Sequence, residues 1–254
     1  MLAKRRQLQI CGMEIERTPL LVPSFSSKGF PDVAKILKTA EEIIEGAMLV
    51  SAYDIYYGEI SPPFDFAPLV FLDSGGYEAS KDSELSDLRE RDHDPREWKQ
   101  EFHREVVGSW STQSPTVFIS YDHPKERLLA REQIERALAL PLPKNGLREI
   151  LLKPEKEGQT LLRVASVLEN VRLLAGFDII GVTEKEIGNS ILSRMANIAR
   201  LRSALDRVGL DTPIHVFGSL DTVTSLCYFV AGADIFDGLT WLRFAFNDGH
   251  TLYR

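Results

Sequence analysis

The sequence lacks the features of a secreted, disulfide-stabilised or membrane-spanning protein. It has only two cysteines among 254 residues, Cys11 and Cys227, and their wide separation allows neither a disulfide framework nor a four-cysteine metal site. No apolar run reaches the roughly 18 residues that a membrane span needs. The basic residues at 4–6 lead into a mixed stretch at 7–10 and not into the apolar core of a signal peptide. We therefore expect a cytoplasmic protein that does not associate with a membrane and whose cysteines are reduced.

Positive charge is scarce as well. The chain carries 30 lysines and arginines against 37 aspartates and glutamates, a formal net charge of −7. Because lysine and arginine supply most of the nonspecific affinity for phosphate backbones, this balance argues against a broad nucleic-acid surface and leaves a local basic patch open. The length and a hydrophobic content of 44% are enough for one large α/β domain. With no internal repeat, low-complexity tract or linker, residues 1–254 are predicted to form a single domain.

Short apolar runs recur along the chain and alternate with stretches of helical periodicity. The eight candidate strands are 20–25, 48–52, 69–72, 117–121, 150–152, 179–182, 214–217 and 235–239. Between most of them lie candidate helices at 32–45, 95–110, 125–140, 160–174, 190–208 and 219–231. Strands that alternate with helices pair in parallel, and eight such units in about 250 residues predict a (β/α)8 TIM barrel. An open, doubly wound sheet is the alternative.

Both ends of the chain depart from this alternation. Segments 8–10 and 13–15 flank Cys11-Gly12, which predicts an N-terminal β-hairpin that plugs the lower end of the barrel. After the last candidate strand only residues 240–254 remain, too few for a loop and a full helix. The last helix is therefore expected to be incomplete or missing, which would leave an apolar flank. A second copy of the chain, in a homo-oligomer, or a partner protein is expected to cover that flank.

Polar residues follow several of the candidate strands. Asp73 follows the third, Asp122 the fourth and Lys153 the fifth, and Asp237 lies near the end of the eighth. The carboxyl ends of barrel strands meet at one mouth, so Asp73 and Asp237 can face one cavity, as the acid/base and the nucleophile of a retaining glycosyl transfer do. Helix caps and ordinary loop carboxylates are the alternative interpretation. The mixed-charge segment 81–101 is typical of an exposed insertion or lid.

Several stretches resemble the motifs of one enzyme family. Phe71-Leu72-Asp73-Ser74-Gly75-Gly76-Tyr77-Glu78 contains an Asp-Ser-Gly-Gly-aromatic signature. His215-Val216-Phe217-Gly218-Ser219 is similar to Leu-Met-Gly-Val-Gly, and Gly232-Ala233-Asp234-Ile235-Phe236-Asp237 is similar to Gly-Ile-Asp-Met-Phe-Asp. Thr18-Pro19 matches an amino-terminal Thr-Pro element. These motifs, in this order over nearly the whole chain, resemble those of the tRNA-guanine transglycosylases, also called queuine tRNA-ribosyltransferases.

The resemblance implies a base exchange at an N-glycosidic bond of a nucleic acid. Asp237 would attack C1′ of a guanosine, expel guanine and form a covalent sugar-enzyme intermediate, while Asp73 would act as the acid/base. A 7-deazaguanine of the preQ0, preQ1 or queuine type would then take the place of guanine with retention of configuration. The resemblance implies no cofactor.

A base-binding pocket is also implied. Tyr77 and Phe217 match the residues that sandwich the purine, and Asp122 matches the carboxylate that accepts hydrogen bonds from the guanine N1–H and amine. Gly181 matches the glycine whose backbone N–H meets the base carbonyl. The other substrate-binding positions implied are Ser74, Lys153, Val182, Glu186 and Gly218, and Arg243 is the expected nucleic-acid contact.

Several positions depart from the family. Lys153 stands where the family usually has glutamine, residues 182–185 replace its Leu-Ala-Val-Gly loop, and only Arg243 remains of its arginines after the nucleophile. The family's zinc segment of three cysteines and one histidine is missing, so no metal is expected. The nucleic acid can therefore be tRNA or DNA. A DNA-specific insertion enzyme, an N-glycosidase acting on a free nucleoside and a non-catalytic partner subunit are the alternatives.

Overall fold

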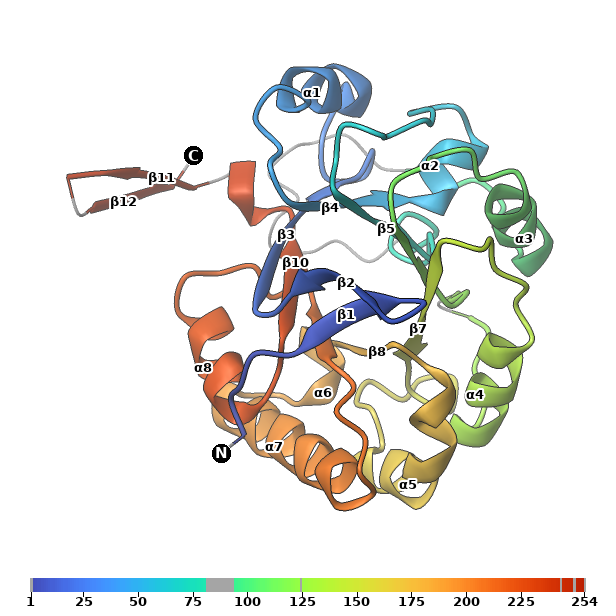
Figure 1. Cartoon of the computed structure of the whole chain (residues 1–254), viewed down its shortest axis with the longest axis vertical. Coiled ribbons are helices and arrows are strands. Elements are labelled where there is room, and N and C mark those ends of the chain that lie inside the picture. The colour runs from blue at the N-terminus through green and yellow to red at the C-terminus, as the bar shows by residue number, and fades with distance from the viewer. Residues whose placement is uncertain (1, 81–93, 124, 243, 249, 254) are drawn as a thin grey trace.

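Eight parallel strands form a closed barrel. The computed structural model describes residues 2–80, 94–123, 125–242, 244–248 and 250–253. The barrel strands are β3 (Leu20–Phe25), β4 (Ala47–Ser51), β5 (Leu69–Asp73), β6 (Thr116–Ile119), β7 (Gly146–Leu152), β8 (Ile179–Thr183), β9 (Ile214–Phe217) and β10 (Ile235–Gly238). They follow one another in chain order, and β10 closes the ring by pairing with both β9 and β3 (Figure 1). The predicted (β/α)8 TIM barrel is confirmed, and the open doubly wound sheet is wrong.

Helices surround the barrel and connect its strands. They are α1 (Val33–Ala40), α2 (Ala52–Tyr56), α3 (Gln100–Gly108), α4 (Ala130–Leu138), α5 (Val164–Glu169), the 3-10 helix η1 (Val171–Gly176), α6 (Glu184–Ile187), α7 (Ile191–Arg207) and α8 (Thr224–Ala231). Over the ranges that the structure describes, none of them is both long enough and apolar enough to cross a membrane.

Several expected helix boundaries differ from the structure, and two of the differences have clear local reasons. α8 begins at Thr224 and not at 219, because the Asp221 carboxylate accepts hydrogen bonds from the backbone N–H groups of Val223 and Thr224, both at 2.9 Å. The stretch 160–174, expected as one helix, is divided at Asn170 into α5 and η1. The Asn170 amide donates to the Ser166 carbonyl at 2.9 Å, and such local bonds compete with a continuing helix.

Side chains of the barrel strands alternate between the interior and the layer beneath the helices. The interior is apolar through most of its depth, with Val22, Phe71 and Ile119 fully buried. At the carboxyl ends the inward positions become polar: Ser24, Ser51, Asp73 and Asp237. An apolar barrel therefore ends in a polar mouth, as in other barrels that carry a site at this end.

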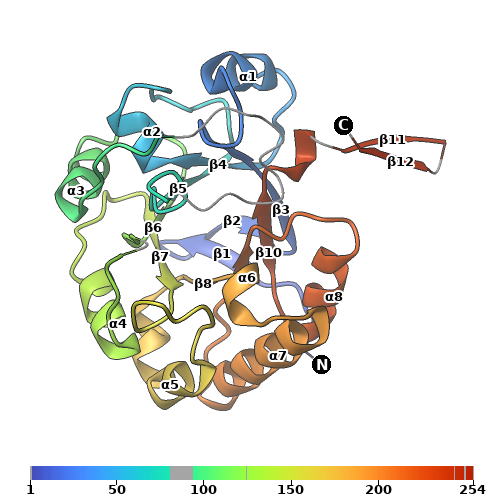
Figure 2. The ribbon, with the colours of Figure 1, turned by 180° about the vertical axis from the view of Figure 1, so that it is seen from behind.

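The N-terminal hairpin covers the lower end of the barrel, as predicted. β1 (Gln7–Ile10) and β2 (Met13–Arg17) pair antiparallel, and Leu8 packs into the interior with only 2% of its surface exposed. The buried guanidinium of Arg6 donates to the carboxylate of Asp234, just before β10, at 2.6 Å. The hairpin lies in front of the barrel in Figure 1 and behind it in Figure 2, which looks onto the opposite mouth.

A 3-10 turn and a second hairpin, instead of an α-helix, follow β10 in the described residues. They are η2 (Thr240–Leu242), β11 (Phe244–Asn247) and β12 (His250–Tyr253), and the hairpin projects from the side of the barrel (Figure 1). Leu21 on β3 is 64% exposed, although its register partner Phe236 on β10 is buried beneath α8. The last helix, which was expected to be incomplete or missing, is absent from the described chain, and the outer face of β3 is open there.

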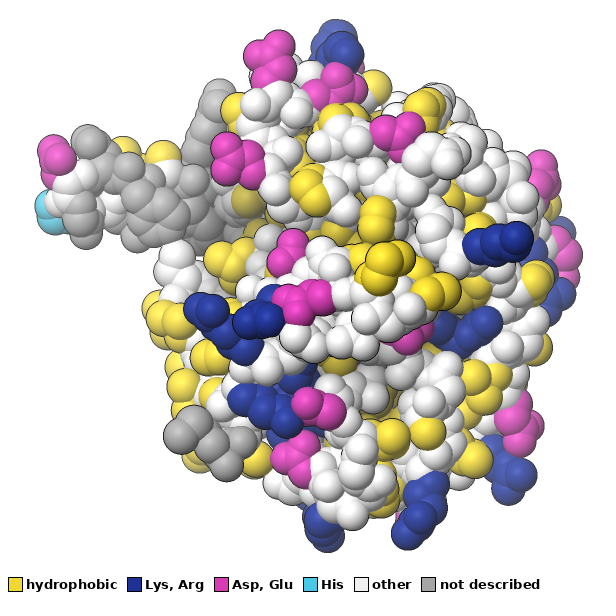
Figure 3. All heavy atoms as spheres, in the orientation of Figure 1, with side chains coloured by type: hydrophobic (Ala, Val, Ile, Leu, Met, Phe, Trp, Pro, Cys, Tyr) yellow, Lys and Arg dark blue, Asp and Glu magenta, His cyan; other side chains and the backbone are white. Residues whose placement is uncertain are grey.

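The outward face of α8 is apolar too. Val223, Leu226 and Val230 are each more than 60% exposed and follow one another at helical spacing. Figure 3 shows hydrophobic side chains gathered over this helix. We call Leu21, Val223, Leu226 and Val230 the apolar flank.

The mixed-charge segment 81–101 differs in part from its prediction. Residues 81–93 lie outside the described residues. Trp98 is only 3% exposed, and its indole N–H donates to the Ser74 carbonyl at 3.0 Å. Gly75 has a φ of 82°, and a Cβ there would lie 2.8 Å from the indole ring. The prediction of an exposed insertion or lid is therefore wrong at Trp98. Gly75 leaves room for the indole ring, which packs on the loop after β5.

Candidate active site

Asp237 lies on the inward side of β10, where three donors surround its carboxylate. Oδ1 accepts a hydrogen bond from the backbone N–H of Gly218 at 3.0 Å and lies 3.2 Å from Nε2 of His215. Oδ2 accepts the hydroxyl of Ser24 at 2.8 Å. These donors come from β9, from the turn after it and from β3, the two strands that pair with β10. The carboxylate is thus fixed in place and provided with partners for a negative charge.

Asp73 ends β5 in a different environment. Burial raises the pKa of Asp73 to about 8, and the charges of Glu78 and Asp237 act in the same direction. The backbone N–H groups of Ser74 and Gly75 oppose this shift without overcoming it. At neutral pH Asp73 is therefore mostly a neutral acid, with a proton to donate. The mouth combines this acid with the hydrogen-bonded carboxylate of Asp237, the kind of division of labour that acid–base catalysis uses.

Two further buried carboxylates support the loops of the mouth, and the sequence reasoning misses both. The oxygens of Glu78 accept the hydroxyls of Ser26 and Ser51, the latter at 2.7 Å. Asp54 accepts the backbone N–H of Ser27 at 2.8 Å and its hydroxyl. Burial, reinforced by the charge of Glu78, raises the pKa of Asp54 well above its ordinary value. In the sequence, the position of Glu78 directly after the Gly-Gly-aromatic motif indicates that it belongs to the mouth.

A buried row of three ionisable side chains crosses the barrel interior. His215 lies between Asp237 and Glu149, and its Nδ1 is 2.8 Å from Oε1 of Glu149. Burial alone would lower the pKa of His215, but the two carboxylates outweigh it and raise the pKa to about 9. Burial also raises the pKa of Glu149. We assign the shared proton to the imidazole, because it has a carboxylate on each side.

Sequence reasoning misses this row because of a strand boundary. The candidate strand 150–152 is too short, and the real β7 begins at Gly146, which places Glu149 on its inward side. His215 was recoverable, since it lies two residues before Phe217 on one strand and must share its face.

Three predicted substrate-binding residues meet in a charged cluster. Nζ of Lys153 lies 3.4 Å from Oδ2 of Asp122 and 2.7 Å from Oε2 of Glu186. Arg127, which was not predicted, places Nη1 3.2 Å from Oδ1 of Asp122. Burial would lower the pKa of Lys153, but the Asp122 and Glu186 carboxylates outweigh it and raise the pKa above its usual value. Lys153 therefore stays a cation between two carboxylates.

Asp122 does not have the alternative role of a helix cap. The helix expected to begin near residue 125 begins at Ala130, and the residue that precedes it is Leu129. Asp122 lies instead at the mouth, 6% exposed, between Arg127 and Lys153. The helix-cap interpretation is wrong because α4 starts further along the chain, at Ala130.

The aromatic residues expected to hold the base occupy different surroundings. The ring of Phe217 faces inward and stacks on the imidazole of His215, with 3.9 Å between centroids and 26° between planes. Tyr77 is half-buried, and the ammonium of Lys28 lies 4.3 Å from the centre of its ring. Both lie in loops or strand ends of the mouth, where Phe217 stacks on an imidazole and Tyr77 faces an ammonium.

The small residues of the expected pocket are close-packed. A Cβ on Gly181 would lie 2.6 Å from the Phe217 ring and 2.7 Å from Oε1 of Glu149, so glycine is required there. Val182 points away from the interior and packs beneath the helices, which leaves only its backbone for the mouth. The Ser74 hydroxyl accepts the Gly76 N–H at 3.3 Å. Arg243 lies outside the described residues.

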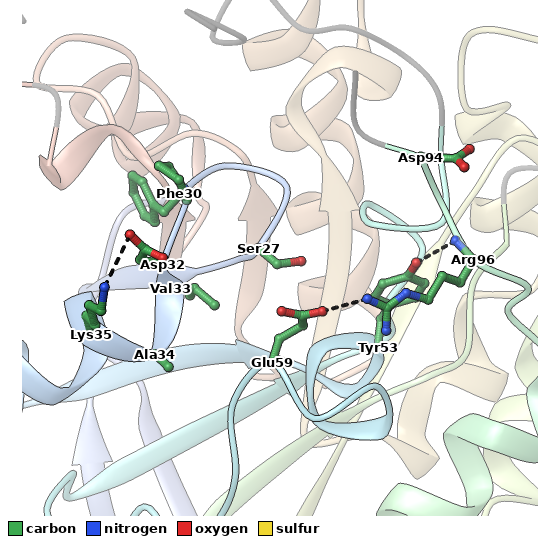
Figure 4. A pocket seen from close by; sticks show the side chains of 11 residues that line it. Ser27, Phe30, Asp32, Val33, Ala34, Lys35, Tyr53, Glu59, Asp94 and Arg96 are labelled. Carbon is green, nitrogen blue, oxygen red and sulfur yellow. Dashed lines mark hydrogen bonds and ion pairs between the residues drawn. The ribbon is translucent and has the colours of Figure 1, made fainter. Parts of the chain in front are cut away.

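A separate cavity of about 430 Å³ lies at the rim of the mouth. Figure 4 shows it between the start of α1 and the residues around α2, with Ser27, Tyr53 and Glu59 among its lining residues. Arg96 pairs with Glu59 there at 2.9 Å. Neither Asp73 nor Asp237 lines this cavity, so we assign the chemistry to the two aspartates and not to this cavity.

No group of three or more histidine, cysteine, aspartate or glutamate side chains that could hold a metal ion occurs in the ranges that the structure describes. The described mouth offers a proton donor at Asp73, a fixed carboxylate at Asp237 and a cation held between carboxylates at Lys153. These groups can carry out proton transfer and nucleophilic attack.

Comparison with known proteins adds no family assignment. No model of a protein family matches the chain, and no curated protein matches it.

The raised pKa of Asp73 predicts how stability depends on pH. The folded protein keeps the Asp73 proton up to about pH 8, whereas the unfolded chain releases it near its ordinary pKa of 3.8. The stability that Asp73 contributes is therefore complete below the unfolded pKa and is lost as the pH rises toward 8. Asp73→Asn cannot ionise, so its free energy of unfolding should rise relative to wild type by at most about 1.4 kcal/mol per pH unit across this window.

Thermal or chemical unfolding from about pH 5 to about pH 9 measures this difference. Asp32→Asn, at an exposed aspartate before α1, is the matched control and should show no such trend. A constant difference between Asp73→Asn and wild type would contradict the raised pKa.

Proposed function

We propose that the chain is a nucleic-acid guanine transglycosylase of the tRNA-guanine transglycosylase superfamily, a pentosyltransferase that exchanges guanine for a 7-deazaguanine base. The observation that carries the proposal is the pair of aspartates at one mouth. Asp73 is a buried acid with a pKa of about 8, and Asp237 is a carboxylate fixed by three donors. A retaining transfer at an N-glycosidic bond needs one group of each kind.

The proposed reaction has two displacements at C1′. In the first, an oxygen of Asp237 bonds to C1′ as the bond from C1′ to N9 of guanine breaks, and the Asp73 proton goes to the departing guanine. In the second, the incoming base loses its N9 proton to Asp73, N9 bonds to C1′, and the electron pair of the ester bond returns to Asp237. Two inversions give net retention, and Asp73 ends protonated as it began, because the N9 proton of the incoming base replaces the one that left with guanine.

The charged cluster supports recognition of a guanine-type edge. A carboxylate at Asp122 can accept from N1–H and the exocyclic amine, while the ammonium of Lys153 can donate to the neighbouring carbonyl. An adenine edge would instead set the N1 lone pair against the carboxylate. Phe217 would provide an aromatic face for the base, which any flat heterocycle can use.

The nucleic acid is proposed to be tRNA or DNA, encountered in the cytoplasm. Both share the guanine nucleoside that this chemistry requires, and they differ at the 2′-hydroxyl and in backbone shape. An N-glycosidase would use the same aspartates but would release the sugar to water instead of a second base. The assay below therefore includes each polymer and a free nucleoside.

Asp237→Asn is expected to abolish exchange, because an amide cannot supply the anion that attacks C1′. The loss in kcat/KM should be at least about 1,000-fold. Incorporation of labelled guanine into tRNA, into DNA or into neither, with guanosine as a third substrate, measures it. The covalent adduct trapped by denaturation during turnover should disappear as well.

Asp234→Asn is the matched control, since Asp234 lies three residues earlier and bonds Arg6 at the other end of the barrel. It should lower the melting temperature and leave exchange by the folded protein intact. Near-normal exchange by Asp237→Asn would contradict its role as nucleophile.

Asp122→Ala is expected to weaken base binding and relax base selection. Loss of one partner of a buried, charged hydrogen-bond pair typically costs about 2–5 kcal/mol, so affinity for guanine should fall on the order of 30-fold or more. Equilibrium binding of guanine and adenine measures both effects. Asp178→Ala, at an exposed carboxylate near the lower end of the barrel, should alter stability alone. Unchanged affinity and selectivity in Asp122→Ala would contradict the assignment.

The partner proposed for the apolar flank is a second copy of the chain. Leu21 lies beside a strand covered by α8, and Val223, Leu226 and Val230 form one stripe on that helix. A stripe of this kind is self-complementary about a twofold axis and can be covered by the same stripe of another copy.

Leu226→Gln combined with Val230→Gln should therefore convert a dimer into a monomer, because two apolar side chains in the middle of the stripe are lost. Light scattering over a range of protein concentrations measures the molecular mass. Met13→Gln, at an equally exposed side chain on the N-terminal hairpin, is the control and should leave the dimer intact. A wild-type monomer at every concentration would contradict the proposal.

A further inference from the structure

The row formed by Glu149, His215 and Asp237 has no evident structural purpose. Glu149 and His215 are completely buried in the middle of an otherwise apolar barrel. Apart from the His215 contact, Glu149 makes little use of its charge: Oε2 has no hydrogen-bond partner among the described residues. Buried charges with few partners cost stability, and apolar side chains of similar size usually fill such positions better. Groups of this kind concentrate at functional sites.

The geometry fixes the imidazole tightly. Phe217 stacks on one face, and Phe71 meets the ring edge to face at 5.5 Å and 71°. Gly181 on β8 leaves just enough room for the Phe217 ring and the Glu149 carboxylate. The charged groups that face His215 are therefore Glu149 from β7 and Asp237 from β10, while β5 and β8 contribute Phe71 and Gly181.

The two oxygens of Asp237 are unequal as a result. Oδ1 has the Gly218 N–H and His215 Nε2, whereas among the described residues Oδ2 has only the Ser24 hydroxyl, which can rotate away. Oδ2 is thus the oxygen free to bond to the sugar. Oδ1 would remain with its two donors and become the carbonyl oxygen of the ester.

We infer that Glu149 and His215 are positioning residues for Asp237: Glu149 holds the imidazolium, and the imidazolium holds Oδ1 so that Oδ2 attacks and later leaves. The inference rests on the proposed function, because it assigns these residues to its covalent intermediate. A charged donor on Oδ1 withdraws electron density from the ester and stabilises the carboxylate that departs in the second displacement. The proton stays on His215 throughout, since Glu149 keeps a negative charge beside it when Asp237 becomes an ester.

The first experiment measures the charge state of His215 and does not depend on activity. The chain has five histidines, and labelling them with nitrogen-15 allows each imidazole to be titrated by NMR. In wild type, His215 should remain an imidazolium until about pH 9. Glu149→Gln keeps the shape and removes the charge, so the His215 midpoint should fall by about one pH unit or more.

The second experiment measures the covalent intermediate. Glu149→Gln and His215→Asn should lower kcat for exchange about 10–100-fold, with little change in KM for the base, because neither residue touches it. The fraction of enzyme trapped as the sugar adduct should rise in both variants. Removing the charged donor slows the departure of Asp237 more than it slows the attack by Asp237. The pH profile of kcat should also lose the change near pH 9 that deprotonation of His215 causes in wild type.

His103→Asn provides the control at a second buried histidine. His103 bonds the Ile119 carbonyl at 3.1 Å, and burial lowers its pKa to about 4, so it carries no charge near neutral pH. Its replacement should change the melting temperature without raising the adduct fraction. A loss of stability alone in Glu149→Gln and His215→Asn, with an unchanged adduct fraction and pH profile, would overturn the inference.

The two experiments separate failure of the inference from failure of the proposed function. A neutral His215 at pH 7 overturns the inference whatever reaction the site performs. An imidazolium that disappears in Glu149→Gln supports it, even if wild-type protein exchanges none of the bases offered. Wild-type exchange together with normal adduct levels in the variants overturns the inference while the proposed function stands.

Discussion

The pairing of β10 with β3 is the constraint on which the rest of the site depends. It joins the last barrel strand to the first and brings Ser24 within 2.8 Å of Asp237, across 213 residues of chain. The same strand pairs with β9, whose His215 and following Gly218 supply the other donors. A sheet left open at this seam would separate Asp237 from Ser24. Closure therefore builds the carboxylate's surroundings as well as the barrel.

The motif Asp234-Ile235-Phe236-Asp237 shows how one strand serves both ends of the barrel. Asp234 precedes the strand and bonds the buried guanidinium of Arg6, which holds the N-terminal hairpin over the lower end. Asp237 emerges at the mouth. Between them Ile235 fills the interior and Phe236 packs beneath α8. The two aspartates are only three residues apart, but the length of the strand places one at each end of the barrel. The alternation of side chains along the strand directs Ile235 into the interior and Phe236 toward α8.

Charge balance explains why a lysine is tolerated in the pocket of an acidic protein. Lys153 adds a positive charge in a buried place. Asp122 and Glu186 lie on either side of it, and Arg127 compensates Asp122 in turn. A buried cation is stable when carboxylates with good geometry surround it. Lys153 is therefore part of a balanced cluster, and a single substitution there would leave its partners unbalanced.

The sequence by itself determined the barrel, because periodicity, strand spacing and the Gly-Gly turn after Asp73 are local properties that follow from residue order. It also placed Asp73, Asp122, Lys153 and Asp237 at strand ends, since the end of an apolar run is visible without a structure. Only the tertiary structure decided that Glu149 faces inward, that His215 lies between two carboxylates and that Lys153 joins Asp122 to Glu186. Those contacts join residues far apart in the chain. Their distances and burial, and hence their charge states, are set by how the strands close around them.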